Sequence, residues 1–345
     1  MQIIDVLPSI FEKRYGTNGP DMSRVDEYLP SLGIQPGAVD DAIARVAHQY
    51  YVLGLTQADI AKRLGITRFK AHRMLAQARE RGMVRVELNV SSASRLSLED
   101  RLTERFDLHG AYVCPSDITA DVPLSSVIGH YAASIVAPLI HDGTTIAVSW
   151  GATLRAMAMA LEPVSAQNLS VVPLLGSLAT RSTIDRYEAS SVLAQRLNAE
   201  CFYLPGPILC DSPETKAAID ALPVISETLS KARKAELALL SIGGTNMSSL
   251  FDSGVLSSQD RDSAIAAGAI GNLLGRFIGK DGHQIDHPLN QLCLGIGPEE
   301  VRSVPVRILC AGGPNKLAAI SGALDAGVAT MLVTDETTAN ALLTR

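Results

Sequence analysis

One lysine in the C-terminal part of the chain stands where it could bind an anion. Lys316 follows the turn Gly312-Gly313-Pro314-Asn315 and falls in the first turn of a predicted helix. Backbone N–H groups at a helix N-terminus attract anions, glycine lets a ligand approach the backbone, and lysine adds a point charge. A phosphate group is the ligand that these residues suit best.

Three further stretches rich in glycine or hydroxyl residues each follow a predicted strand. They are Ser149-Trp150-Gly151-Ala152-Thr153, Gly176-Ser177 and Gly243-Gly244-Thr245-Asn246. In an open α/β sheet, ligands bind beyond the carboxyl ends of the strands. One such loop would carry little weight, because tight strand–helix turns need glycine anyway. Four loops together with Lys316 predict a phosphate-binding pocket.

A second feature is positive charge concentrated in an acidic chain. The 345 residues hold 30 Lys and Arg against 36 Asp and Glu, a net charge of −6. Residues 67–81 nevertheless contain five basic residues and one acid. Residues 39–89 sum to +4, which leaves −10 for the remainder. Such segregated charge is typical of a module that binds nucleic acid.

The apolar spacing around the basic segment predicts three helices, over 39–53, 57–64 and 67–81. Thr56 and Thr67 stand as N-caps of the second and third helix, and Gly65 as a left-handed cap between them. The first helix should bury Ile43, Val46, Ala47, Tyr50 and Leu53. The third should bury Ala71, Met74, Leu75 and Ala78. This order of caps and helices predicts a helix-turn-helix.

The third helix would be the recognition helix, whose N-terminal residues meet base edges in the major groove. Arginine pairs with guanine, and threonine or lysine can contact phosphate. The predicted DNA-contacting residues are Thr56, Gln57, Thr67, Arg68, Lys70, His72 and Arg73. The competing interpretation is a solvated basic face within a larger α-helical domain.

The segments around this module differ in pattern. Residues 1–37 contain several Gly and Pro residues and predict a flexible arm. Residues 38–90 form the helix-turn-helix domain and end in a predicted strand over 84–88. Residues 91–109 predict a linker helix whose Leu98, Leu102 and Phe106 serve either as a dimer contact or in packing against the next domain.

Residues 110–345 have the sequence pattern of an α/β domain. Apolar runs rich in β-formers alternate with helical patterns at 145–148, 169–175, 237–242, 306–310 and 329–333. This alternation predicts a parallel sheet covered by helices on both faces. The fold class is therefore a helical domain followed by an α/β domain.

Several classes of protein have no support in the sequence. No segment is apolar and long enough to span a membrane, and no signal peptide is evident, so we expect a cytoplasmic protein. The five cysteines form no CxxC pair, and His283 and His287 lack the context of a metal site, so we expect no metal and no cofactor. No Ser/His/Asp or Cys/His set has a motif context for catalysis.

Five motifs resemble the SorC/DeoR-type sugar-responsive transcriptional regulators. The first, LTQADIAKRLGITRFKAHRML, is similar to the N-terminal helix-turn-helix of that family. The others resemble its effector domain and read SWGATL, AIGNLLGRFIGKDG, PVRILCAGGPNKLAAI and LVTDETTANALL. The match runs in consistent order from about residue 39 to the C-terminus.

The resemblance implies a C-terminal fold shared with ribose-phosphate isomerase and glucosamine-phosphate deaminase, a phosphorylated sugar or polyol as effector, and a homodimer or homotetramer on operator DNA. It implies that Trp150 packs on the ligand and that Lys316 lies beside its phosphate. The other implied effector-binding residues are Gly151, Thr153, Gly176, Ser177, Gly243, Gly244, Asp281 and Gly313.

The chain departs from the family pattern at two places. The family often reads GDxxGxFFDxxG where this chain reads GNLLGRFIGKDG, so Asn272 replaces an Asp and Gly279 replaces a ligand-binding Asp. Asp281 is then the candidate for the lost hydroxyl contact. In the recognition helix the usual Val-Ser pair is Ala71-His72, which predicts a different operator.

Two functions are compatible with these features. The first is a DNA-binding transcriptional regulator of a carbohydrate or polyol catabolic operon, which is not an enzyme. The second is a sugar-phosphate isomerase or deaminase with an appended helical domain. The sheet and its phosphate loops suit both, but the basic helix has no purpose in an enzyme and no general base stands in a motif context.

Overall fold

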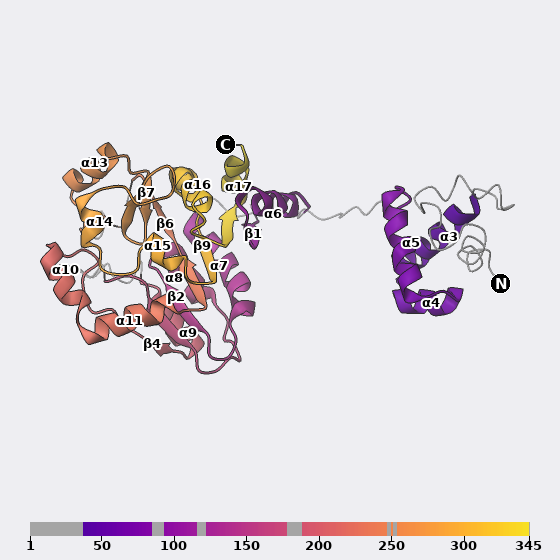
Figure 1. Ribbon diagram of the computed structural model, residues 1–345, viewed down its shortest axis with the longest axis horizontal. Helices are drawn as coiled ribbons and strands as arrows, with labels where there is room; N and C mark the ends of the chain where they lie inside the picture. Colours follow the sequence, from indigo (N-terminus) through magenta and orange to yellow (C-terminus); the bar gives the residue numbers. More distant parts are fainter. Residues whose placement is uncertain are drawn as a thin grey trace, which may run out of the picture. The chain divides into compact units, whose positions relative to one another are not determined.

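The structure is a computed structural model that describes residues 37–84, 93–115, 122–177, 188–246, 250 and 254–344. The chain divides into two compact units, Met1–Asn89 and Val90–Arg345 (Figure 1). Apart from Gly37, the predicted arm over 1–37 lies outside the described residues, as does the predicted strand over 84–88 apart from Val84.

The first unit contains the three predicted helices. They are α3 (Gly37–Ala47), α4 (Gln57–Leu64) and α5 (Arg68–Glu80), and a π-helical segment, His48–Val52, extends α3. Ile43, Val46, Ile60, Ala71 and Leu75 form the centre of their shared core. These three helices bury one small apolar cluster, as the amphipathic spacing predicts.

One part of the predicted buried face is wrong. Tyr50 is 37% exposed and Leu53 is 50% exposed, although both follow the α-helical spacing of Ile43 and Val46. The π-helical segment has more residues per turn than an α-helix. The side chains that follow Ala47 therefore rotate away from the core-facing stripe.

The second unit is built on a seven-stranded sheet with the order β1-β10-β9-β5-β2-β3-β4, and every neighbouring pair is parallel. The strands are β1 (Gly110–Cys114), β2 (Thr145–Val148), β3 (Ser170–Pro173), β4 (Glu200–Cys201), β5 (Leu237–Leu240), β9 (Val306–Cys310) and β10 (Met331–Asp335). The predicted parallel sheet is confirmed, and β1 and β4 extend it beyond the five predicted strands.

Helices cover both faces of this sheet. One face carries α7 (Leu124–Val136), α8 (Ala152–Ala160) and α9 (Ser190–Leu197). The other carries α6 (Ala93–Phe106), α11 (Pro223–Arg233), α16 (Leu317–Asp325) and α17 (Glu336–Leu343). On β9, Ile308 and Cys310 pack into the first layer and Leu309 into the second. Strands buried on both faces in this way read as continuous apolar runs.

Further helices and two 3₁₀ turns lie in the connections of the second unit. They are α10 (Pro213–Asp220), α13 (Ser258–Ala266), α14 (Pro288–Leu292), α15 (Pro298–Val301), and the 3₁₀ turns η4 (Ala137–Leu139) and η6 (Pro314–Lys316). Among the described residues, no helix is both long and apolar enough to cross a membrane.

The predicted linker helix is α6, and it packs within the second unit. Leu98, Leu102 and Phe106 are all buried in the core on the α16–α17 side of the sheet. The helix lies against β1 and α17. Of the two uses expected for these apolar residues, the structure shows packing against the α/β domain.

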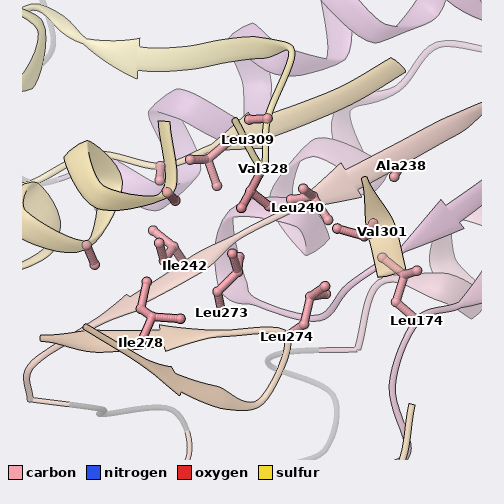
Figure 2. Packing of buried hydrophobic residues seen from close by; sticks show 14 of the residues in the cluster. Leu174, Ala238, Leu240, Ile242, Leu273, Leu274, Ile278, Val301, Leu309 and Val328 are labelled. Atoms are coloured by element: carbon pink, nitrogen blue, oxygen red, sulfur yellow. The ribbon is translucent and has the colours of Figure 1, made fainter. Parts of the chain in front are cut away.

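A second, smaller sheet was not predicted. It is antiparallel and consists of β6 (Ile242–Gly244), β7 (Gly271–Leu273) and β8 (Arg276–Ile278). Ile242, Leu273 and Ile278 join the same core as Leu240 of β5 (Figure 2). Because each strand has only three residues, no alternating pattern long enough to predict it exists in the sequence.

Candidate functional site

The largest group of predicted ligand-binding residues meets at the carboxyl ends of β2 and β5. After β2 the chain continues outward to β3 and β4, and after β5 it continues in the opposite direction to β9 and β10. The neighbouring strands β2 and β5 therefore mark the topological switch point of the sheet. Open α/β sheets bind ligands at this place.

A cavity of about 230 Å³ lies at this switch point. Trp150, Gly151 and Thr153 line it from the end of β2, Gly243 and Gly244 from β6, and Lys316 from η6. These six of the ten predicted effector-binding residues share one pocket. The remaining lining residues are Ser125, Ser149, Ala152, Leu175, Ser241, Ile242, Asn272, Leu274 and Gly275.

Lys316 is the one ionisable side chain among the described residues that line this cavity. It is partly buried, and burial lowers its pKa below the usual lysine range. No carboxylate forms an ion pair with it within the described part of the chain. A desolvated ammonium group without a counter-ion favours an anionic ligand, which would restore its lost solvation.

Three helix starts contribute to the same cavity. Ser125 belongs to the first turn of α7, Ala152 and Thr153 to the first turn of α8, and Lys316 directly precedes α16. None of these three helices has a side-chain N-cap, whereas Ser212, Ser257 and Asp335 cap α10, α13 and α17. The backbone N–H groups at the uncapped starts of α7 and α8 are donors that an anion can satisfy, whereas α16 continues η6, in which the N–H groups of Lys316 and Leu317 already donate to the carbonyl oxygens of Gly313 and Pro314.

Gly176 and Ser177 line a neighbouring cavity of about 200 Å³. Phe202, Tyr203 and Leu204 also line it, and this compartment is more apolar. The two cavities share Ser149, Trp150 and Leu175. Trp150 thus stands between a compartment with a cation and one with aromatic residues.

Two predicted effector-binding residues have other surroundings. Among the described lining residues, neither Asp281 nor Gly313 belongs to either cavity. Asp281 accepts a hydrogen bond on Oδ1 from the backbone N–H of His283, at 3.1 Å. The backbone N–H of Gly313 donates to Oγ1 of Thr338, at 2.8 Å. Gly313 therefore anchors the turn that carries Lys316 to α17.

The histidines of the HxxxH stretch have separate partners. Nδ1 of His283 lies 2.9 Å from Oε1 of Glu299, whereas His287 caps α14 and contacts Oγ of Ser263. Within the described residues, no group of His, Cys, Asp and Glu side chains is arranged to hold a metal ion.

Sequence reasoning did not place Ser125, Ser241 or Asn272 in the cavity. Ser241 separates β5 from β6, and its Oγ donates to the carbonyl oxygen of Trp150, at 2.6 Å. Asn272 reaches the cavity from β7. The sequence carried one signal for it, since Asn272 departs from the family pattern within the motif AIGNLLGRFIGKDG.

In the first unit, the structure shows the turn between α4 and α5 that the sequence predicts. Oγ1 of Thr56 accepts from the backbone N–H of Asp59, and the Asp59 carboxylate accepts from the backbone N–H of Thr56. Gly65 has φ 65° and caps α4 in the left-handed conformation. Oγ1 of Thr67 accepts from the backbone N–H of Lys70, at 3.1 Å. Both threonines therefore fix helix starts.

The outward face of α5 carries the predicted DNA-contacting side chains. Arg68, His72 and Arg73 are exposed, and neither arginine has an acidic partner within the described residues. Lys70 is half-buried. Gln57 at the start of α4 lies 3.5 Å from His72 through Nε2 and Nδ1, so the two helix starts present adjacent polar groups.

Phe69 was missed as a candidate for DNA contact. Its side chain is 76% exposed. Helical spacing places it beside Arg73, opposite the buried Ala71, Met74, Leu75 and Ala78. The signal was present in the sequence, because Phe69 falls outside the apolar stripe of the third helix.

Comparisons with known proteins assign the chain to a family. A family profile described as "Putative sugar-binding domain" matches residues 91–344. The Enterobacter sp. (strain 638) transcriptional regulator LsrR is 30% identical over 310 residues, which cover 88% of this chain and 93% of LsrR. The Brucella abortus erythritol catabolism regulatory protein EryD is 28% identical and covers 88% of this chain and 97% of EryD.

A solved structure covers both units. The full-length sorbitol operon regulator SorC from Klebsiella pneumoniae is 29% identical, with a TM-score of 0.68, over 88% of this chain and 98% of SorC. These relatives are transcriptional regulators, so the interpretation as an isomerase or deaminase is not favoured. The chain therefore belongs to the SorC family of sugar-binding transcriptional regulators.

Proposed function

We propose that this protein binds operator DNA through α4 and α5 and controls a carbohydrate or polyol catabolic operon in response to a phosphorylated sugar or polyol. The ligand binds in the cavity between the ends of β2 and β5. The names of the relatives support the ligand class, since they refer to a sorbitol operon, erythritol catabolism and a deoxyribonucleoside.

The surroundings of Lys316 are the observation that supports a phosphate group on the ligand. Lys316 is the one ionisable group among the described residues that line a cavity at which α7 and α8 begin without a side-chain cap. A phosphate would accept hydrogen bonds from their N–H groups and neutralise the ammonium group. Trp150 lines both this cavity and its more apolar neighbour, and it would pack on the carbon chain of the ligand.

The DNA-binding part of the proposal is supported by α5. Its first two turns present Arg68, Phe69, His72 and Arg73 to the outside. Arginine pairs with guanine O6 and N7, and the N-terminal half of a recognition helix is the part that meets base edges. A homodimer or homotetramer would place two such helices on half-sites about 34 Å apart along the DNA.

Regulation requires that the ligand bind two arrangements of the protein with different affinity, because a ligand that binds both equally shifts nothing. One experiment tests the whole proposal. Fluorescence anisotropy measures binding to the DNA upstream of the neighbouring operon, at several salt concentrations and with a panel of sugar and polyol phosphates. We expect salt-sensitive binding that one phosphorylated compound changes.

Two outcomes would contradict the proposal. Absence of DNA binding under all conditions would exclude the proposed contact of α5 with the major groove. If DNA binding responds only to an unphosphorylated sugar, the ligand is not a phosphorylated compound. Sedimentation of the protein with and without DNA then gives the number of subunits.

A further inference from the structure

The turn that carries Lys316 is tied to α17 by one buried hydroxyl group. Thr338 of α17 is 3% exposed. Its Oγ1 accepts a hydrogen bond from the backbone N–H of Gly313, at 2.8 Å, and donates to Oδ1 of Asp335, at 2.6 Å. A hydroxyl group has one proton and can accept while it donates, so these two contacts fix its orientation.

Asp335 holds this hydroxyl group in place and also shapes the turn. Its Oδ2 accepts from the backbone N–H of Thr338, at 3.0 Å, so the same carboxylate caps α17. A Cβ atom on residue 312 would overlap with Oδ1 of Asp335, and only glycine lets the turn lie directly on the carboxylate. Gly313 has φ 101°, a conformation that other residues rarely adopt. The turn is therefore built to fit the start of α17.

The two helices that hold the turn also contact α6. The first, α16, begins after Lys316, and Asp325 at its other end forms an ion pair with Arg105 of α6, at 3.2 Å. This pair is about half exposed and contributes little energy by itself. The second, α17, packs against α6, and its Ala339 and Leu342 belong to the same core as the buried face of α6 (Figure 1). The stronger connection from the turn to α6 therefore runs through α17.

The place of α6 in the chain makes this connection relevant to DNA binding. Among the described elements, α6 is the first of the second unit, so the polypeptide runs from the DNA-binding unit into α6. Close-packed interiors have low compressibility and transmit small displacements. A shift of the turn would reach α6 through Thr338 and the packed face of α17.

We propose that Thr338 is a positioning residue that couples the effector site to α6. Its hydroxyl group holds the turn at Gly313, so a phosphorylated effector that binds beside Lys316 changes the packing of α17 against α6. The two arrangements that regulation requires differ in this packing. The inference rests on the proposed function, because it takes Lys316 as the anion-binding group of the effector cavity. It adds the regulation of that site.

The first test needs no variant. Amide hydrogen exchange of the full chain is measured with erythritol 4-phosphate, sorbitol 6-phosphate, deoxyribose 5-phosphate and inorganic phosphate. A probe that slows exchange in the turn around Lys316 should also change exchange in α6, by about twofold or more. A change in the turn without a change in α6 would overturn the inference and leave the proposed function standing. If neither the three sugar and polyol phosphates nor inorganic phosphate affects the turn, the anion site is excluded and the coupling with it.

The second test removes the hydroxyl group. Thr338→Val has nearly the same shape but leaves the N–H of Gly313 without its acceptor. Fluorescence anisotropy with the DNA upstream of the neighbouring operon gives the ratio of DNA affinities without and with a saturating phosphorylated probe. Saturation removes any effect of a weaker probe affinity on this ratio. We expect a ratio of about fivefold or more for the parent protein and less than about twofold for Thr338→Val.

Two further variants separate coupling from a general loss of structure. Thr338→Ser keeps the hydroxyl group and should keep the ratio of the parent protein. Thr337→Val is the matched control, since it makes the same change at the exposed neighbouring residue of α17. Thermal unfolding verifies the fold of each variant, and the exchange measurement decides the inference if Thr338→Val does not fold. A parental ratio in Thr338→Val, or an equal loss in Thr338→Ser or Thr337→Val, would contradict the role of the hydroxyl group.

Discussion

Gly244 of β6 lies directly against the carbonyl oxygen of Asn315. A Cβ atom on residue 244 would overlap with this oxygen and would come within 3.3 Å of the backbone nitrogen of Lys316. The contact joins the small antiparallel sheet to the turn after β9, two segments far apart in the sequence. Two loops that the sequence identifies separately therefore depend on each other.

The first prediction concerns this contact. Gly244→Ala should displace the turn at 314–316 and move Lys316, because the overlap is with backbone and not with a flexible side chain. We expect affinity for the phosphorylated ligand to fall by about tenfold or more, measured by calorimetry. Thr245→Ala is the control, since this neighbouring residue is exposed. Equal affinity of the two variants for the ligand would show that the turn at 314–316 accommodates the added methyl group without a loss of binding.

The second prediction concerns pH. Burial lowers the pKa of Lys316, so the free protein loses this proton at a lower pH than an ordinary lysine would. The charged form binds the anion, and affinity should therefore fall as pH rises through the lowered pKa. Calorimetry across the alkaline range measures this fall.

Lys316→Met serves as its control. This variant should bind the phosphorylated ligand weakly and without the alkaline decline, because the titrating group is absent. An unchanged pH profile in the variant would assign the titration to another group. A flat profile in the parent protein would place the ammonium group outside the contact with the anion.

The third prediction concerns the two exposed arginines of α5. Arg68→Ala and Arg73→Ala should each weaken operator binding by about tenfold, because both side chains are exposed and neither has an acidic partner among the residues that the structure describes. The salt dependence should become shallower by about one ion for a lost phosphate contact. Arg101→Ala, an exposed arginine on α6 of the other unit, is the matched control. Gel shifts that do not change for either α5 variant would exclude this face from DNA contact.

The fourth prediction concerns Phe69. An exposed aromatic ring beside Arg73 is suited to contact with the C5-methyl group of thymine. Phe69→Ala should leave the thermal midpoint unchanged, since the side chain is 76% exposed, and should weaken operator binding by roughly fivefold to tenfold. Replacing operator thymines by uracil should weaken the parent protein and not the variant. Equal losses for both proteins would assign Phe69 another contact.

Local chemistry in the sequence was sufficient for the helix-turn-helix. Thr56 and Asp59 form the predicted capping box, Gly65 adopts the predicted left-handed cap, and Thr67 caps α5. These interactions join residues at most four positions apart, so the order of residue types decides them. The same locality explains the one error at Tyr50 and Leu53. A π-helical segment changes the turn without a pattern that marks it.

The sequence also determined the fold class of the larger unit. Apolar runs such as 237–240 are buried on both faces, and a run of that kind predicts a parallel strand covered by helices. Loops rich in glycine after these runs predicted the residues at the ends of β2, β5 and β9. Lys316 was identified from its place after Gly312-Gly313 alone.

Only the tertiary structure decided which loops meet. The strand order brings the ends of β2 and β5 together at the switch point, and it places Gly176 and Ser177 in a neighbouring compartment. Asp281, chosen from its position in a motif, lies at the turn after β8 and hydrogen-bonds to His283. Strand order depends on packing between segments far apart in the sequence, such as β2 and β5, and no local pattern records it.

The burial of Asn272 has the same origin. Its neighbours in sequence are Gly271 and Leu273, but the residues that enclose its amide come from β6. The sequence by itself determined which residues could bind DNA or an anion, and the tertiary structure decided which of them share one cavity, because shared cavities arise from long-range packing.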